Sequence, residues 1–378
     1  MDVVDQAFKD AVADGSIHGA VLLAKDTSGR VNVSRSYGVR SLRDADPEKR
    51  PPMEIDTPMR IASASKLLSS IMVLQCVDQG LVGLDDTLHK LLPEVAKQKV
   101  LTGFDDDGKP IEREPKTPVL VRHLLAHTSG ISYALPHPLL TRFRKGQGVE
   151  VDQGYDTLDE NFQYPLIFDP GTSNTYGPGL DWSSRLIARA SGMPTEEFLQ
   201  KNLVEPLGLT ADDMTFELQK HPKTQERRSD MTWRADGIYT SPEAYMRVLW
   251  SILSNDGKLL KPGTRDFVFE PDLSHDVYKG VEGFLEEFKA WGAGAPVPAE
   301  IKKSVSVAGL VTLEDCDGDR WRRKGNLSWS GLPNFIWNID PEAGLCSVWA
   351  FHLKPSFDPT CMALGKKFEE AVFAMVKS

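Results

Sequence analysis

The most constraining feature of this sequence is a stretch at residues 65–79 that is apolar on nearly every side of a helix. Gly80 follows it directly, where a helix C-terminal cap is expected. A helix that is apolar all round has to be buried. We therefore expect other elements to enclose this one. Its apolar residues are Leu67, Leu68, Ile71, Met72, Val73, Leu74, Cys76 and Val77.

Composition narrows the class of protein. The chain has 378 residues, of which 40% are hydrophobic and 26% charged, as in ordinary globular proteins. It is two to three times the roughly 100–200 residues of a usual single core, so one large layered domain or two halves are expected. The net charge of −10 argues against a nucleic-acid partner, because phosphate binding needs an excess of Lys and Arg.

Targeting signals give a consistent expectation. The N-terminus is acidic and amphipathic, without the basic start and apolar core of a secretory signal. No stretch approaches the roughly 18 apolar residues that span a bilayer. The four cysteines form no C-x-x-C pair, which favours reduced thiols. We expect a soluble, cytoplasmic protein without a membrane partner.

Strand patterns lie near both ends of the chain and helical patterns lie between them. This order predicts one sheet with a helical insertion, that is, an α/β (α+β) fold. We divide the chain into a sheet domain, residues 1–62 and 226–378, and a mainly helical domain, residues 63–225, with the active site between them. Strands are expected at residues 20–24, 31–37, 304–314, 326–340 and 344–352, helices at 4–12, 119–126, 180–191, 194–203, 242–254 and 359–376, and long loops at 101–118 and 128–175.

A serine and a lysine three residues apart stand where the buried helix begins. Ser63 and Lys66 would share one helical face. Serine is a poor nucleophile until a base takes its proton, and lysine can do so only when neutral, far from its usual pKa of about 10.4. Burial disfavours the ammonium form, so we predict Ser63 as nucleophile and Lys66 as base. The alternative is an exposed serine beside a solvated lysine.

Two further elements complete a candidate site. Tyr176 lies in a Gly/Pro-rich turn before a helix, where its hydroxyl could carry protons to and from Ser63. A tyrosine that merely lines the core is the alternative. Gly331, inside a predicted strand, would let a ligand approach the backbone. The N–H groups of Leu332 and Ser63 would then form an oxyanion hole, each worth about 3 kcal/mol; a bulge at a sheet edge is the alternative.

One metal-like pattern is set aside. His123 and His127 stand four residues apart, as in zinc proteases, but Leu124 occupies the position of the required glutamate. We predict no metal site and no cofactor.

With these elements in this order, the chain resembles the serine β-lactamase and penicillin-binding-protein superfamily over its whole length. It looks most like the class C-like esterases and acyltransferases, in particular the fungal lovastatin-type polyketide transesterases. Supporting stretches are residues 60–66, 124–130, 176–182, 321–325 and 333–341. The resemblance implies a β-lactamase/transpeptidase-like antiparallel sheet flanked by helices from both chain ends.

The resemblance also implies roles for individual residues. Ser63 would be acylated with Lys66 as its base and Tyr176 beside it, and the Ser63 and Leu332 N–H groups would stabilise the oxyanion. Arg60 matches a residue that lines the acceptor pocket. We assign Tyr133 and Trp329 to substrate binding as well.

Some positions depart from the family pattern. Trp329-Ser330-Gly331 replaces the Lys-Thr-Gly of penicillin-recognising members, and Tyr176-Gly177-Pro178 replaces Tyr-x-Asn, so β-lactam hydrolysis is not expected. The segment at residues 228–245 looks shortened. Ser356 stands where transesterases can carry a pocket tryptophan.

Three functions stay open. The first is an acyltransferase that moves an acyl group from a thioester or ester, on an acyl carrier protein or coenzyme A, through Ser63 to a hydroxyl of a small secondary metabolite. The second is an ester hydrolase with the same Ser–Lys–Tyr chemistry, in which water replaces the alcohol. The third is a catalytically impaired, lactamase-like binding protein, which the shortened segment motivates.

Overall fold

The computed structural model describes the whole chain apart from residues 136, 150–156, 230–236, 291–296, 298–299, 317–320 and 378, and the side chains of residues 287–290. The predicted buried helix is confirmed as α2 (Ser65–Asp78). Its apolar side chains belong to one large core that also includes residues of the sheet and of the surrounding helices. Gly80 follows α2 with a φ of 70°, as expected for the cap.

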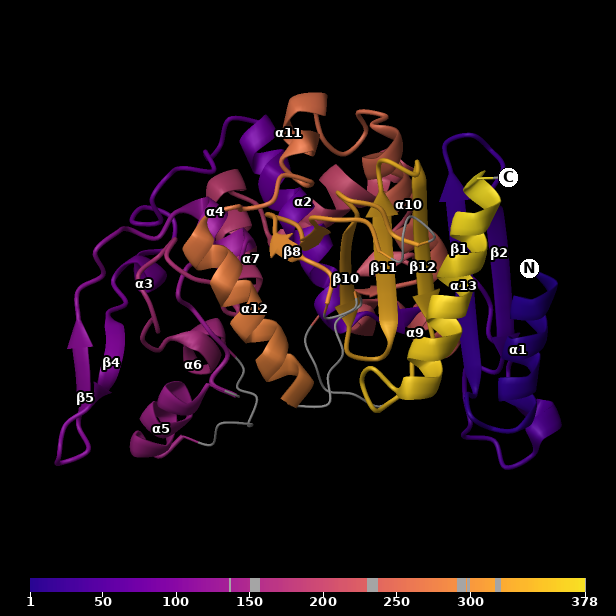
Figure 1. Cartoon of the computed structure of the whole chain (residues 1–378), viewed down its shortest axis with the longest axis horizontal. Coiled ribbons are helices and arrows are strands. Elements are labelled where there is room, and N and C mark those ends of the chain that lie inside the picture. The colour runs from indigo at the N-terminus through magenta and orange to yellow at the C-terminus, as the bar shows by residue number, and fades with distance from the viewer. Residues whose placement is uncertain are drawn as a thin grey trace.

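A seven-stranded sheet forms the second structural unit, in the order β2-β1-β12-β11-β10-β9-β8 (Figure 1). Every neighbouring pair is antiparallel. The N-terminal hairpin pairs with the last strand, so the two ends of the chain share one sheet. The strands are β1 (Gly19–Asp26), β2 (Asn32–Gly38), β8 (Lys303–Val305), β9 (Leu310–Thr312), β10 (Leu327–Gly331), β11 (Phe335–Asp340) and β12 (Leu345–Ala350).

Helices cover both faces of this sheet. Successive side chains of a strand point to opposite faces; accordingly Leu22 joins one core while Val21 and Leu23 join the other. The first core contains α1 (Asp2–Ala13) and α13 (Pro359–Lys377), which come from opposite ends of the chain and lie side by side in Figure 1. The second contains α2 and α10 (Pro242–Ser254).

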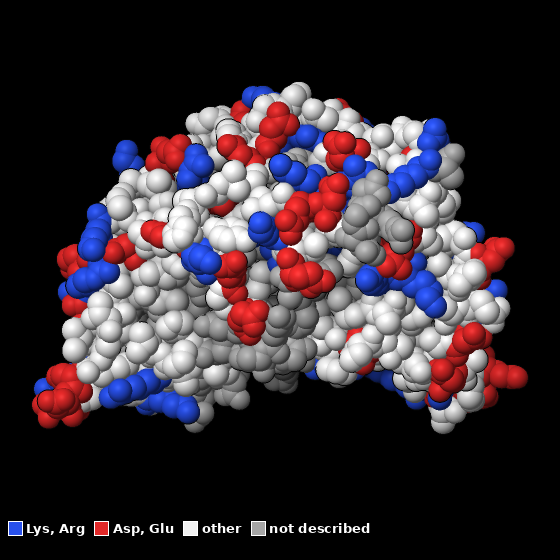
Figure 2. All heavy atoms as spheres, in the orientation of Figure 1, with Lys and Arg blue, Asp and Glu red and all other residues white. Residues whose placement is uncertain are grey.

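The remaining helices are α3 (Pro93–Ala96), α4 (Val121–Leu125), α5 (Pro138–Gly146), α6 (Leu158–Phe162), α7 (Gly179–Ser191), α8 (Thr195–Leu199), α9 (Pro222–Arg227), α11 (Pro262–Asp266) and α12 (His275–Ala290). Of these helices, α3, α4, α5, α6, α7 and α12 lie on the β8 side of the sheet together with the β4–β5 hairpin, whereas α11 lies at the top of the view and α9 where the sheet is drawn (Figure 1). None of the helices described is both long and apolar enough to cross a membrane. On the face in Figure 2, acidic and basic side chains are intermixed. The proposed division at residues 62/63 and 225/226 stays a prediction.

Several segments differ from the sequence-based expectation. The expected loop at residues 101–118 contains the hairpin β4 (Val100–Phe104) and β5 (Pro110–Arg113), and the expected loop at 128–175 contains α5 and α6. The weakly patterned region after residue 262 contains the 16-residue helix α12. The glycines in α12 have low helix propensity, which hides the helix in the sequence.

Each of two segments predicted as a single strand forms two strands joined by a turn. Residues 304–314 form β8 and β9, separated by a turn with Gly309, and residues 326–340 form β10 and β11. The turn between β10 and β11 has Asn334 at a φ of 56°, a left-handed conformation that asparagine tolerates.

A buried ion pair fastens α13 to the sheet. The Glu369 carboxylate accepts two hydrogen bonds from the Arg322 guanidinium, both at 2.8 Å, and both side chains are fully buried. Trp321, Trp349 and Asn338 donate to the same carboxylate at 2.6–3.0 Å. Five hydrogen bonds thus meet at this carboxylate, which offsets the cost of burying its charge.

We predict that Glu369→Gln lowers the free energy of unfolding by about 3–5 kcal/mol, since it leaves the Arg322 charge buried without a counter-ion. Denaturant unfolding followed by circular dichroism measures this loss. The neighbouring Glu370→Gln removes only a half-exposed pair with Lys366 and serves as the control, with an expected change below about 1 kcal/mol. Equal losses in the two variants would contradict this account of α13.

Candidate active site

Ser63 lies in a short 3₁₀ turn (Ala62–Ala64) between β3 (Met59–Arg60) and α2. Ala62 has a φ of 46°, a left-handed conformation that costs a non-glycine residue roughly 1–2 kcal/mol. Hydrogen bonds hold the turn on both sides: the Ile238 N–H donates to Ser65 Oγ at 2.9 Å, and the Tyr245 hydroxyl donates to the Ala64 carbonyl at 2.9 Å. The strained turn is thereby fixed with Ser63 at the cavity.

Gly331 brings the strand β10 against this turn. A Cβ atom on Gly331 would lie 2.0 Å from the Ile61 carbonyl oxygen, so no other residue fits there. The absence of a side chain at Gly331 thus serves a contact with the protein's own chain, and the approach of a ligand to the backbone here stays a prediction. The close contact places Leu332, the next residue, at the same cavity as Ser63.

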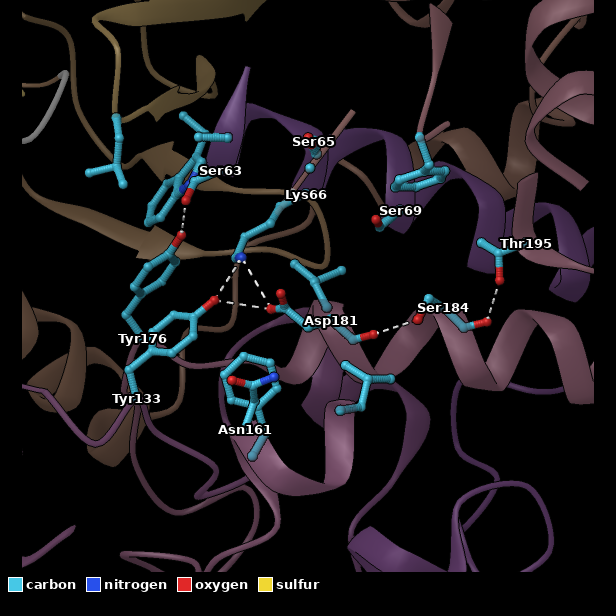
Figure 3. A pocket seen from close by; sticks show the side chains of 18 of the residues that line it. Ser63, Ser65, Lys66, Ser69, Tyr133, Asn161, Tyr176, Asp181, Ser184 and Thr195 are labelled. Atoms are coloured by element: carbon cyan, nitrogen blue, oxygen red, sulfur yellow. Dashed lines mark hydrogen bonds and ion pairs between the residues drawn. The ribbon is translucent and has the colours of Figure 1, made fainter. Parts of the chain in front are cut away.

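Tyr176 reaches Ser63 directly. Its hydroxyl donates a hydrogen bond to Ser63 Oγ at 2.7 Å (Figure 3). The loop that carries it is tied to the segment after α4, because the Asn174 side chain donates to the Ala126 and His127 carbonyls at 3.0 and 3.2 Å. The Ser63–Tyr176 contact joins residues 113 positions apart in the chain.

Lys66 completes a second group of contacts. Its Nζ lies 3.1 Å from the Tyr133 hydroxyl and 3.4 Å from the Asp181 carboxylate, and the Tyr133 hydroxyl donates to that carboxylate at 3.0 Å. The same Nζ lies 5.3 Å from the centre of the Tyr176 ring. Figure 3 shows the Lys66 amine, the Tyr133 hydroxyl and the Asp181 carboxylate pointing toward one another, beside Ser63 and Tyr176.

The charge state of Lys66 differs from the sequence-based prediction. Burial is the largest influence on the pKa of Lys66 and lowers it, but the Asp181 carboxylate and the Tyr133 and Tyr176 side chains together outweigh burial, so the pKa lies well above its usual value. This direction is opposite to the expectation that burial would give a neutral amine, because Asp181 is distant from Lys66 in the sequence. The raised pKa favours the ammonium form of Lys66.

The two histidines set aside as metal ligands have structural positions. Burial and then the Lys66 charge lower the pKa of His127 to about 3, so its ring is neutral. Its Nδ1 accepts from the Gly177 N–H at 3.4 Å. His123 Nδ1 accepts from the Leu120 N–H at 3.2 Å, which caps α4. The His123 ring thus binds the backbone of its own helix, and the His127 ring binds the backbone of the Tyr176 loop.

A cavity of about 990 Å³ opens onto these groups. That volume suits an organic molecule of drug size. Trp329 forms one wall with its ring centre 5.4 Å from that of Tyr176, and Phe284 of α12 stands 5.7 Å from Tyr176. Water next to Ser63 is therefore restricted by three aromatic rings.

The structure brings most of the predicted site residues together but not all of them. The residues at the common cavity are Ser63, Lys66, Tyr133, Tyr176, Trp329 and Leu332. Arg60 instead packs over the Tyr239 ring at 5.4 Å and is absent from the described lining. Phe357 lines the cavity where Ser356 was considered. Within the shortened segment, residues 230–236 lie outside the described residues.

Two residues of the site were missed. Asp181 stands in the first turn of α7, five residues after Tyr176, and contacts Lys66. Its one sequence signal is that it is a carboxylate in the first turn of the helix that follows the Tyr176 loop. Phe284 belongs to the unpredicted helix α12.

A mixed helix and antiparallel-sheet fold with this serine site defines a class of protein. The family model described as "Beta-lactamase" matches residues 4–363, and the chain belongs to that family. The predicted family and fold are thereby confirmed.

Individual relatives are more informative. The chain is 40% identical over 396 residues to the monacolin J acid methylbutanoyltransferase of Aspergillus terreus, covering 98% of this chain and 95% of that protein. It is 32% identical over 400 residues to the lovastatin esterase of Penicillium rubens, covering 98% of each. A solved mutant of simvastatin synthase from Aspergillus terreus superposes with a TM-score of 0.91 at 41% identity, covering 99% of this chain and 98% of that one.

We predict that Asp181→Asn slows the reaction of Ser63 with a fluorophosphonate probe at neutral pH. Without the carboxylate, burial dominates and the pKa of Lys66 falls, so the ammonium form is lost at a lower pH than in the wild type. The alkaline limb of the pH–rate profile should therefore move to lower pH.

Asp85→Asn removes a carboxylate from a surface pair with Arg122 and is the matched control. Its profile should equal that of the wild type. A faster reaction of Asp181→Asn at neutral pH would instead support a neutral amine as the base.

Proposed function

We propose that this protein is a serine acyltransferase that moves an acyl group through a Ser63 acyl-enzyme to a hydroxyl of a small secondary metabolite. The observation that carries the proposal is the 2.7 Å hydrogen bond between Tyr176 and Ser63, beside an ammonium group and at the wall of a large cavity. The similarity to a methylbutanoyltransferase over 98% of the chain supports it.

In the acylation step, the Tyr176 hydroxyl first releases its own proton to solvent. Ser63 Oγ then attacks the carbonyl carbon of the donor, and the Ser63 proton moves across the 2.7 Å contact to Tyr176 Oη. The N–H groups of Ser63 and Leu332 hold the oxyanion. Tyr176 then gives the proton to the leaving thiol or alcohol as its bond to the acyl carbon breaks.

In the transfer step the acceptor hydroxyl takes the place of the leaving group. Tyr176 removes its proton, the acceptor oxygen attacks the acyl carbon, and the proton returns to Ser63 Oγ as the ester of the enzyme breaks. Asp181 and Tyr133 contact neither reacting atom. They are positioning residues that keep Lys66 charged and in place.

The donor and the compartment belong to the proposal too. We favour a thioester on an acyl carrier protein or coenzyme A as the donor, because thiolates leave more readily than alkoxides. We place the reaction in the cytoplasm. None of the described site residues selects between these two carriers of the acyl group.

Ester hydrolysis is the second candidate, and the similarity to the lovastatin esterase favours it. The two activities differ only in whether water or an alcohol reaches the acyl-enzyme. The aromatic wall of Trp329, Tyr176 and Phe284 favours transfer because it limits water near Ser63. A catalytically impaired binding protein is the remaining alternative.

We predict that the wild type gains the mass of one acyl group when it is incubated with an acyl thioester or a chromogenic ester. Ser63→Ala should show no gain, because the nucleophile is gone, while Ser36→Ala, on the exposed side of β2, should label as the wild type. Intact mass spectrometry measures both. Labelling of Ser63→Ala would refute the assigned nucleophile, and no labelling of the wild type would favour the binding protein.

Product analysis separates transfer from hydrolysis. With a secondary alcohol added, the acylated alcohol should exceed the free acid. Free acid alone with every alcohol tried would replace the transferase by the hydrolase.

We predict that Tyr176→Phe lowers the acylation rate by about 10²–10⁴-fold, the usual contribution of a positioned acid–base group. The fold should be retained, since phenylalanine keeps the ring that packs against Tyr133 and Trp329. Stopped-flow release of the chromophore gives the rate, and a loss below about tenfold would remove Tyr176 from proton transfer.

A further inference from the structure

The cavity continues well beyond the reacting groups. In Figure 3, Ser63 and Tyr176 lie at one end, Lys66 and Asp181 in the middle, and Ser69, Ser184 and Thr195 towards the other end. Ser69 follows Ser63 by six residues and belongs to α2. We call this end the distal arm, and its polar side chains are Ser69, Ser184, Thr195, Glu196 and Glu217.

Most of these polar groups can only accept hydrogen bonds from a ligand. The Ser184 hydroxyl donates to the Asp181 carbonyl at 2.8 Å, and the Thr195 hydroxyl donates to the Ser184 carbonyl at 2.8 Å. Their protons are therefore used, and lone pairs remain. The Ser69 hydroxyl has no hydrogen-bond partner within the described part of the chain, and Figure 3 shows it at the cavity. A ligand group that donates hydrogen bonds, such as a hydroxyl, matches this lining.

The charges of the distal arm point the same way. Glu196 is bonded by neutral donors only, the Gln200 and Thr215 side chains and the Phe216 N–H, at 2.7–2.8 Å. Its negative charge is therefore not cancelled by these contacts. Glu217 pairs with Lys220 at 2.7 Å, but the lysine is largely exposed. Lys66 is the single cationic side chain among the described lining residues, and Asp181 already pairs with it.

The size of the cavity indicates which substrate enters the distal arm. A short acyl group on Ser63 fills only a small part of about 990 Å³, so the acceptor has to occupy the rest. The walls of the cavity include Leu158, Phe162 and Phe216. The cavity thus offers apolar walls around acceptor-rich polar groups and an excess of negative charge.

We propose that the acyl acceptor carries an uncharged hydroxyl group at the end remote from the hydroxyl that is acylated, bound by Ser69 and its neighbours, and that the distal arm rejects acceptors with a carboxylate there. This inference rests on the proposed acyl-transfer function and names its acceptor class. The substrate is a neutral, largely apolar polyol. One relative is named a monacolin J acid methylbutanoyltransferase. A preference for an acceptor without an acid group would distinguish this protein from that relative.

The test uses three acceptors with the same body and reacting hydroxyl but different far ends: hydroxymethyl, methyl and carboxylate. Transfer from the preformed acyl-enzyme gives kcat/KM for each. We expect hydroxymethyl to exceed methyl by about 3–10-fold, the value of one hydrogen bond. We expect the carboxylate to react at least about tenfold more slowly than methyl, because like charges meet.

Variants connect these ratios to residues. Ser69→Ala should bring the hydroxymethyl-to-methyl ratio towards one. Glu217→Gln should raise the rate of the carboxylate acceptor alone by several-fold. Glu282→Gln is the matched control, because Glu282 forms the same kind of pair, with Lys279 at 2.7 Å, outside the cavity lining; its ratios should equal those of the wild type.

Binding of the same acceptors to Ser63→Ala, measured by calorimetry, separates this inference from the proposed function. The expected order of affinity is hydroxymethyl, methyl, carboxylate, whether or not the wild type forms an acyl-enzyme. Equal binding, or tightest binding of the carboxylate, would overturn the inference. The expected order together with no acyl-enzyme would leave it standing and remove the acyltransferase.

Discussion

A lysine ammonium group that is almost removed from water sets the requirements for the whole site. The Lys66 side chain is 11% exposed, and a charge at that depth persists only with a counter-ion close by. Asp181 supplies it, and Tyr133 bonds to both partners. The first turn of α7 must therefore face α2, which fixes the loop that carries Tyr176. The pairing of Lys66 with Asp181 therefore also positions Tyr176 relative to Ser63.

Two close backbone contacts make this arrangement possible. Gly331 lets β10 touch the turn before α2, and Gly280 lets α12 touch the Tyr176 loop, where a Cβ atom would lie 2.2 Å from the Asn174 nitrogen. The first contact delivers Leu332 and Trp329 to the cavity, and the second delivers Phe284. The sheet, the buried helix and the outer helices meet at Ser63 through these contacts.

Sequence reasoning found the parts of the site that have local signatures. Ser63 and Lys66 are three residues apart, and Tyr176 stands in a Gly/Pro-rich turn, so each has a local signal that becomes specific only in combination with the others. Asp181 was not, because its partner is 115 positions away and only the fold brings them together. The charge state of Lys66 was misjudged for the same reason, since burial is visible in a sequence and a distant counter-ion is not.

The fold shows the same division between local and distant information. The buried helix and the terminal strands and helices follow from periodicity, and Gly80 marks a real end. Helix α12 did not follow, because the glycine that weakens its helical pattern is the one that lets it pack against residue 174. Arg60, assigned to the acceptor pocket by resemblance alone, packs on Tyr239 instead.

The charge of Lys66 can be measured without any substrate. Protein labelled with ¹⁵N at the lysine side-chain nitrogens gives one Nζ signal per lysine, and the signal missing from Lys66→Met identifies this residue. The account predicts an ammonium resonance that persists from neutral to alkaline pH, beyond the point where exposed lysines lose their protons. A neutral-amine resonance at neutral pH would contradict it.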